Sequence, residues 1–221
     1  MKGIIFDMDG TMVDNMMVHH RAWQKELAAL GLNMPLEEVK EKVHGVNTEI
    51  LERLFGDRFT PAERQQISDK KEAAYREIFK SELRLVDGLA ALLKELHSAG
   101  IPMAIGTAAP AENVDFVLDQ LNIRHYFQSV CHAGSVSQGK PHPEIFIKAA
   151  QGMGLAPNNC LVFEDSVTGA ETAKRAEATA IIVTTTHAPE EFSDFDHIHQ
   201  FIPDFTEIDL PYLRQAFRFN R

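Results

Sequence analysis

Short apolar runs recur along the chain, and each is followed by a small or polar cluster and then by a helical pattern. The runs cover Gly3–Phe6, Pro102–Ile105, Cys160–Phe163 and Ala180–Val183. Continuous apolar runs of this length, separated by helices, are typical of parallel strands that are buried on both faces. We therefore predict four buried parallel strands.

Apolar residues between these runs recur three or four positions apart, which places them on one face of a helix. The first pattern ends at Gly100, in the position after a helix where glycine is favoured, and the second opens beside Pro110. Helices that alternate with buried strands predict a doubly wound, Rossmann-like α/β sheet. The three apolar stripes are Leu89, Leu92, Leu93 and Leu96; Val114, Val117, Leu118 and Leu121; and Phe146, Ala149, Ala150 and Met153.

Residues 15–85 break this alternation, because they read as helices throughout and contain no strand pattern. We predict an inserted all-helical cap over 15–85, with a core formed by 1–14 and 86–221. The expected helices of the cap are Met16–Leu30, Pro35–Val43, Thr48–Phe55 and Pro61–Phe79.

An insertion directly after the first strand is expected to cover the carboxyl end of the sheet, where ligands bind in such folds. It would act as a lid that closes over a small substrate, with hinges near Asp14–Met17 and Leu83–Gly88. A purely stabilising insertion is the alternative.

The composition of the chain limits the kinds of partner that the protein is expected to bind. The 221 residues carry a net charge of −10, which argues against nucleic acid or an anionic membrane as a partner. No apolar run approaches the ~20 residues that span a bilayer, and the N-terminus lacks a leader pattern, so we expect a cytoplasmic protein. Cys131 and Cys160 are far apart and are expected to be buried and reduced. We expect a monomer or a weak oligomer.

Carboxylates follow two of the predicted strands. Asp7 and Asp9 come directly after the first, and Glu164 and Asp165 come after the third. The carboxyl ends of parallel strands meet at one edge of the sheet, where four carboxylates would repel one another unless a cation were bound. Oxygen ligands suit Mg²⁺, which commonly accompanies a phosphate group. A hydroxyl and an ammonium group, from Thr107 after the second strand and from Lys140 before the third, would complete a phosphate clamp.

The order and spacing of these residues resemble the four motifs of the haloacid dehalogenase superfamily, over essentially the whole chain. Asp7-Met8-Asp9-Gly10-Thr11 is similar to the first motif and Thr107 to the second. Lys140-Pro141 resembles the third, and Glu164-Asp165-Ser166 with Gly169 resembles the fourth. The segment from Phe6-Asp7 through His19 to Trp23 is most similar to the β-phosphoglucomutase group and its phosphatase relatives.

This resemblance implies a role for each residue. Asp7 would attack phosphorus and form an aspartyl-phosphate. Asp9 would protonate the leaving oxygen as a general acid and then activate the incoming water or alcohol as a base. Mg²⁺ would be held by Asp7, the Asp9 backbone carbonyl and Asp165, with Glu164 nearby or as a direct ligand.

The same resemblance assigns the phosphate-binding residues, which are Gly10, Thr107, Ala108 and Lys140. The proposed site residues also have simpler interpretations, and Asp7 and Asp9 could be turn and helix-cap residues. Thr107 and Asp165 could each cap the helix that follows, and Lys140 could be a solvated surface lysine.

The cap departs from the mutase pattern. The family's mutases have a lysine and an arginine where this chain has His44 and Thr48, and these hold a second phosphate. Neutral Thr48 cannot replace a bidentate guanidinium, and His44 is largely uncharged near neutral pH. His19 aligns with a histidine that the mutases keep near the nucleophile, and a half-buried helix position beside Trp23 is the alternative. Because a second phosphate would lack the charged contacts that the mutases provide at positions 44 and 48, we favour hydrolysis over mutase activity.

The sequence predicts a Mg²⁺-dependent phosphohydrolase that acts on a small phosphorylated metabolite, with a sugar phosphate as the expected substrate. A β-phosphoglucomutase-type phosphosugar mutase is the first alternative. The second is a non-enzymatic phosphoacceptor switch, which also clusters acids, a hydroxyl and a lysine but has no use for a base such as Asp9. Glu177 stands where relatives commonly have glycine, and it would be strained by about 1 kcal/mol if the position needs a positive φ.

Overall fold

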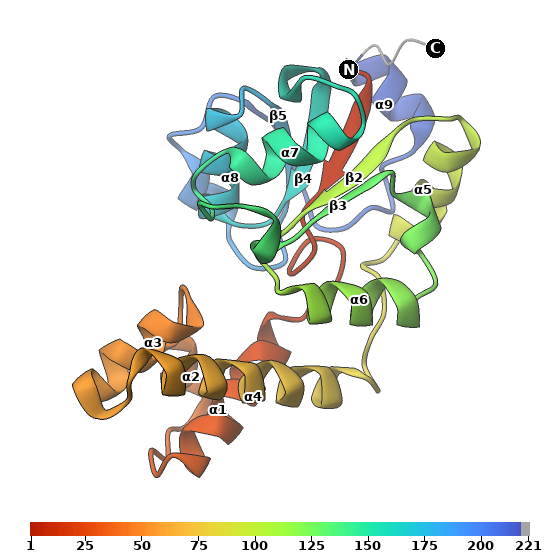
Figure 1. The fold of residues 1–221 in the computed structure, drawn as a ribbon. Helices are drawn as coiled ribbons and strands as arrows, with labels where there is room; N and C mark the ends of the chain where they lie inside the picture. The colour runs from red at the N-terminus through yellow and green to blue at the C-terminus, as the bar shows by residue number, and fades with distance from the viewer. Residues whose placement is uncertain (218–221) are drawn as a thin grey trace. The chain divides into compact units, whose positions relative to one another are not determined.

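The structure is a computed structural model that describes residues 1–217. One part of the molecule is built around a parallel sheet with the strand order β3-β2-β1-β4-β5-β6 (Figure 1). All five strand pairings are parallel. The predicted doubly wound α/β fold is confirmed. The strands are β1 Gly3–Phe6, β2 Met103–Gly106, β3 Ser129–Cys131, β4 Cys160–Glu164, β5 Thr179–Val183 and β6 Ile198–Ile202.

The four predicted strands are present, and the structure adds β3 and β6 at the two edges of the sheet. Strands β1, β2 and β4 are buried along their whole length, as their apolar runs predicted. The edge strands are only partly buried and carry polar residues such as Ser129 and Gln200. An edge strand has one unpaired side and needs no continuous apolar run, so the sequence pattern missed both.

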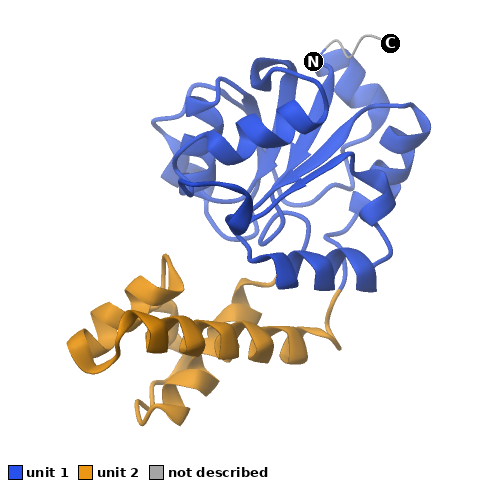
Figure 2. Cartoon of the chain, viewed as in Figure 1, with its two compact units in different colours: residues 1–14, 84–221 blue, residues 15–83 orange. Residues whose placement is uncertain are grey.

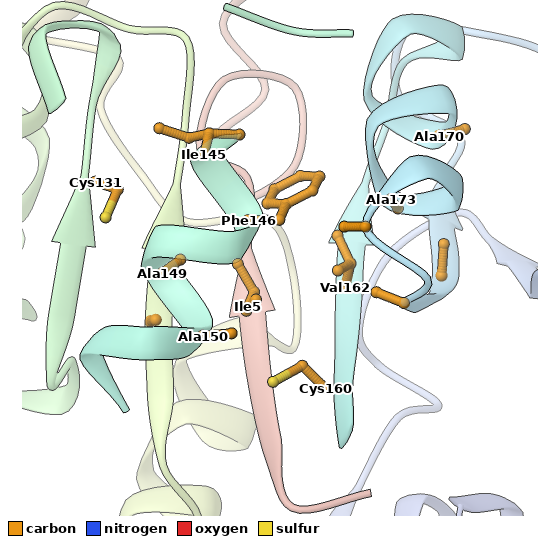
Figure 3. Packing of buried hydrophobic residues seen from close by; sticks show 14 of the residues in the cluster. Ile5, Cys131, Ile145, Phe146, Ala149, Ala150, Cys160, Val162, Ala170 and Ala173 are labelled. Atoms are coloured by element: carbon orange, nitrogen blue, oxygen red, sulfur yellow. The ribbon is translucent and has the colours of Figure 1, made fainter. Parts of the chain in front are cut away.

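Helices α7 and α8 cover one face of the sheet (Figure 1). The side chain of Phe146 on α7 packs in a buried cluster with Ile5 of β1 and Val162 of β4 (Figure 3). On the other face Phe6 stacks on Phe163 at 5.1 Å between ring centroids, and Phe205 packs against both. The helices of this part are α5 Leu89–Ser98, α6 Ala111–Gln120, α7 Glu144–Gly152, α8 Val167–Arg175 and α9 Leu210–Phe217, with short 3-10 helices at Arg124–Tyr126, Ala133–Ser135, Pro157–Asn159 and Pro189–Phe192.

The structure divides into two compact units, one of residues 1–14 and 84–221 and one of residues 15–83 (Figure 2). The second unit is all-helical, as predicted, and has its own core around Trp23, Leu27 and Leu51. Its helices are α1 Met16–Ala29, α2 Leu36–Lys42, α3 Asn47–Phe55 and α4 Pro61–Phe79, with a 3-10 turn at Gly56–Arg58.

Backbone conformation bears out two expectations about glycine positions. Gly100 follows α5 with a φ of 69°, as its place after the leucine stripe predicted. Glu177 follows α8 with a φ of 59°, so a non-glycine residue does occupy the left-handed region there. Within residues 1–217, none of the helices combines the length and the apolar character that crossing a membrane requires.

Candidate active site

Asp7 is the first residue after β1 and is only 5% exposed. Its backbone N–H donates to the carbonyl of Phe163, which continues the ladder between β1 and β4 and fixes where the side chain leaves the sheet. Asp7 therefore stands at the carboxyl end of the sheet, with β4 and its acidic residues as the neighbouring strand.

Three of the predicted carboxylates come together. Oxygens of Asp7, Glu164 and Asp165 all lie within 4.8 Å of one another, and all three residues are buried. Burial raises the pKa of Asp7 to about 7, against the opposing effect of Lys140 and with help from Glu164 and Asp9. Burial, Glu164 and Asp7 also hold the pKa of Asp165 well above its usual range. A compact set of buried oxygen ligands with excess negative charge fits a divalent cation such as Mg²⁺.

Lys140 places a positively charged ammonium group among these carboxylates. Its Nζ donates to Asp7 Oδ1 at 2.7 Å and to Glu164 Oε1 at 2.6 Å, and its side chain is only 8% exposed. Although burial opposes it, the two carboxylates raise the pKa of Lys140, which keeps the ammonium charged. The Nζ also lies 4.8 Å from the ring centre of Phe146. The interpretation of Lys140 as a solvated surface residue is wrong.

Glu164 uses both of its carboxylate oxygens for contacts inside the protein. Oε1 accepts from Lys140, and Oε2 accepts from the backbone N–H groups of Asp165 and Ser166, both at 2.9 Å, and from the Ser166 hydroxyl at 3.0 Å. The side chain is therefore fixed from two sides.

Asp165 does not cap the helix that follows it, so that interpretation is wrong. The N-cap of α8 is Ser166, whose Oγ accepts from the Gly169 N–H at 3.0 Å. The Asp165 carboxylate instead accepts a hydrogen bond from the Thr11 hydroxyl at 3.3 Å, and the Thr186 hydroxyl, as a donor, opposes the rise in its pKa.

Thr107 follows β2 and is 1% exposed. The helix-cap interpretation is wrong here too, because α6 begins at Ala111 with Pro110 as its N-cap. The Thr107 hydroxyl accepts from the Ala109 N–H at 3.1 Å, within the loop that also contains the exposed Ala108. Thr107 and Ala108 thus stand at the end of β2, the strand that pairs with β1 on the side away from β4.

Gly10 makes the turn that follows Asp7 and Asp9 at the end of β1. Its φ is 79°, and a Cβ on it would lie 2.1 Å from Asp165 Oδ2. Its N–H donates to the Val13 carbonyl at 2.8 Å. Both the left-handed backbone and the close approach of Asp165 require glycine at this position.

The predicted cap residues lie in the helical unit and differ in their surroundings. The His19 ring stacks on Tyr75 at 4.0 Å between centroids, and its Nδ1 lies 2.7 Å from Lys71 Nζ. His44 is exposed, and its backbone carbonyl accepts from the Arg53 guanidinium. Thr48 is half-buried on α3.

Sequence reasoning missed Lys71, which is 2% exposed and contacts Glu72 at 2.9 Å. Asn47 donates to the same glutamate at 2.7 Å. The sequence does hold an indication of this cluster. Lys71 lies four residues after Ile67 and four before Tyr75, so a charged residue stands on an apolar helical face.

A parallel α/β sheet with buried carboxylates at its carboxyl end is the arrangement that the predicted hydrolase class requires. Comparison with known proteins gives the family. A family model described as haloacid dehalogenase-like hydrolase matches residues 1–177. The chain belongs to this family, which confirms the predicted superfamily. The named relatives also support the predicted class of enzyme, which is a phosphatase with phosphomutase as second choice.

Similar proteins include both phosphatases and mutases. Fructose-1-phosphate phosphatase YqaB of Escherichia coli is 32% identical over 82% of this chain and 95% of its own length. β-Phosphoglucomutase of Bacillus subtilis is 30% identical over 82% of each chain. Among solved structures, a haloacid dehalogenase hydrolase of family IA, variant 3, from Entamoeba histolytica superposes with a TM-score of 0.89 at 24% sequence identity. The superposition covers 99% of this chain and 100% of that one. At this level of identity the similarity shows the fold alone.

Proposed function

We propose that this protein is a Mg²⁺-dependent phosphohydrolase that acts on a small sugar phosphate through a phosphoryl group carried on Asp7. The observation that carries the proposal is the contact of Asp7 Oδ1 with Lys140 Nζ at 2.7 Å, beside the carboxylates of Glu164 and Asp165. This arrangement supplies a buried carboxylate nucleophile next to a fixed cation that can bind a phosphoryl oxygen.

The first half-reaction transfers the phosphoryl group to the protein. A carboxylate oxygen of Asp7 attacks phosphorus, a new O–P bond forms, and the bond from phosphorus to the sugar oxygen breaks. Asp9 donates a proton to that leaving oxygen. Lys140 and the hydroxyl of Thr107 bind the phosphoryl oxygens, and the loop at Ala108 and the turn at Gly10 shape the same site.

The second half-reaction returns the protein to its starting state. Asp9, now a carboxylate, takes a proton from water, and the water oxygen attacks phosphorus of the aspartyl-phosphate. The bond between phosphorus and the Asp7 oxygen breaks, phosphate leaves, and Asp9 is protonated again for the next cycle.

The cation would be held by Asp7, Asp165 and the backbone carbonyl of Asp9. When bound, Mg²⁺ would neutralise the acidic cluster and polarise the phosphoryl group. We assign Glu164 to holding Lys140 in place, because its two oxygens already accept four hydrogen bonds from the protein.

The similarity to a fructose-1-phosphate phosphatase supports a sugar phosphate as substrate. A mutase must also retain a bisphosphate intermediate, and the exposed His44 and neutral Thr48 offer no fixed positive charge for the second phosphate. The similarity to a β-phosphoglucomutase keeps that reaction as the second candidate. A phosphoacceptor switch has the weakest support, since both named relatives are enzymes.

The test is phosphate release by the purified full chain from a panel of sugar phosphates, nucleotides and pyrophosphate, with and without Mg²⁺. Asp7→Asn should lower turnover by at least about a thousandfold, because the nucleophile is lost. Asp57→Asn, which changes an exposed aspartate of the helical unit, should retain activity. Turnover that survives Asp7→Asn would overturn the proposal.

The same preparation separates the hydrolase from the mutase. The mutase reaction would convert β-glucose 1-phosphate into glucose 6-phosphate, and only after a bisphosphate primer is added. We expect phosphate release without primer and no glucose 6-phosphate. Primer-dependent isomerisation that is faster than phosphate release would favour the second candidate.

A further inference from the structure

Three consecutive threonines, Thr184, Thr185 and Thr186, follow β5, the strand next to β4 in the sheet (Figure 1). The three hydroxyls have different further partners, and those of Thr185 and Thr186 also lie 3.5 Å from each other. That of Thr184 donates to the Ile202 carbonyl at 3.2 Å and so ties the loop to β6. The other two reach the acidic site, and the function proposed above gives neither of them a role.

Thr185 donates from its hydroxyl to the carbonyl of Gly10. The N–H of Gly10 donates to the Val13 carbonyl, so the two peptide groups that flank Gly10 are both fixed. The first of these peptides carries the carbonyl of Asp9. A peptide group is planar and trans, so fixing the Gly10 N–H also fixes the direction of the Asp9 carbonyl. Thr185 secures the second peptide and thereby the turn as a whole.

The Thr186 hydroxyl lies beside the Asp165 carboxylate at the Gly10 turn and, as a hydrogen-bond donor, opposes the rise in the pKa of Asp165. Thr11 donates to Oδ1 of the same carboxylate at 3.3 Å. The Thr186 hydroxyl also lies at the contact between Asp165 and Gly10, because a Cβ on Gly10 would come within 2.9 Å of it. Two hydroxyls from distant parts of the chain thus limit the rotation of one buried carboxylate.

We propose that Thr185 and Thr186 are positioning residues of the metal site, Thr186 by orienting the Asp165 carboxylate and Thr185 by fixing the Gly10 turn. The inference rests on the proposed function, since it needs Asp165 and the Asp9 carbonyl to be metal ligands. Asp165 is surrounded by like charge from Asp7 and Glu164, so without a hydrogen-bond donor its carboxylate would turn away when the cation is absent. Groups that hold a ligand in its binding orientation raise metal affinity.

The experiment is calorimetric titration of the full chain with Mg²⁺ in the absence of any substrate. Thr186→Val removes the hydroxyl at nearly constant shape and should weaken Mg²⁺ binding by about tenfold. Thr185→Val should weaken binding in the same direction, and Thr186→Ser, which keeps the hydroxyl, should restore it. Thr184→Val is the matched control, because its hydroxyl bonds only towards β6, and it should bind Mg²⁺ as the unmodified chain does.

Thermal unfolding without metal accompanies each titration, so that a folding defect is recognised, and Thr186→Ala serves as a second variant without the hydroxyl. Asp165→Ala separates the two claims. If it abolishes Mg²⁺ binding while Thr186→Val and Thr186→Ala bind normally, this inference is wrong and the metal site stands. If Thr186→Ser binds as weakly as Thr186→Val, the hydroxyl is not the cause and the inference is also wrong. Normal Mg²⁺ binding by Asp165→Ala would refute the metal site itself.

Discussion

Gly169 on α8 lies directly against the carboxylate of Glu164. A Cβ built on Gly169 would come within 1.8 Å of Glu164 Cδ and 1.9 Å of its Oε1. That same Oε1 accepts the hydrogen bond from Lys140. Glycine is required here by space, and the contact links the fourth sequence motif to the third through a single carboxylate.

Gly169→Ala should therefore lower activity by displacing Glu164 and, with it, Lys140. Overpacking of a buried site costs about 1–3 kcal/mol. We expect a loss of phosphate release of about tenfold or more at nearly unchanged secondary structure, measured by steady-state kinetics and circular dichroism. Gly139→Ala is the control, since nothing lies within 4 Å of the added methyl group. Equal activity in the two variants would contradict the steric argument.

Lys140→Met should destabilise the metal-free protein as well as abolish turnover. The substitution leaves the carboxylates of Asp7 and Glu164 buried without their cation, and breaking a buried pair costs about 3–5 kcal/mol. Urea unfolding with and without Mg²⁺ measures this loss. Lys148→Met removes an ion pair between an exposed lysine and the half-buried Glu144 and should cost much less. Similar losses in the two variants would show that Lys140 is not part of a buried pair.

Stabilisation by Mg²⁺ should increase with pH. The pKa of Asp7 is about 7 in the folded protein, against an ordinary value of 3.8 for the free carboxyl. A carboxyl whose pKa is raised by folding binds more protons in the native state, so its contribution to stability is greatest below the lower value and falls as the pH rises towards about 7. Mg²⁺ would bind the ionised form and so compensate for this loss.

The measurement is the shift in melting temperature on adding Mg²⁺ at several pH values. We expect a small shift near about pH 5 and a plateau above about pH 7. Asp7→Asn should reduce the pH dependence, because it removes one of the two carboxyls with a raised pKa and leaves only Asp165. A shift that stays constant over the whole range in the unmodified chain would contradict the assignment.

Glu177→Gly should stabilise the protein by about 1 kcal/mol, because it removes a non-glycine residue from the left-handed region. The side chain is exposed, so the substitution loses little packing. Glu177→Ala retains the β-carbon and with it the strain, and it should leave the melting temperature nearly unchanged. The prediction fails if alanine and glycine raise the melting temperature equally.

Local pattern was sufficient for a strand that is buried on both faces and for a long helix that is buried on one face. The apolar run Gly3–Phe6 is β1, and the predicted helix Pro61–Phe79 is α4. Their buried positions are mostly apolar and their exposed positions mostly polar, so the pattern along the sequence is clear. The edge strands β3 and β6 were missed, because residues such as Ser129 and His199 can remain polar at a partly exposed edge.

Motif order in the sequence was sufficient to bring Asp7, Lys140, Glu164 and Asp165 to one place, since the carboxyl ends of parallel strands share an edge. It did not determine which side chain bonds to which. The sequence left a helix-cap role open for Asp165 beside metal binding, and only the structure shows that Ser166 caps α8 and that Asp165 faces Thr11 and Thr186.

The sequence by itself thus determined the fold, the family resemblance and the set of residues at the sheet edge, because these follow from periodicity and from order along the chain. Only the tertiary structure decided that Glu164 holds Lys140, that Lys71 is buried beside His19, and that Thr185 and Thr186 reach the acidic site. Such pairings depend on side-chain direction and on distances between segments far apart in the chain, and no local pattern encodes either.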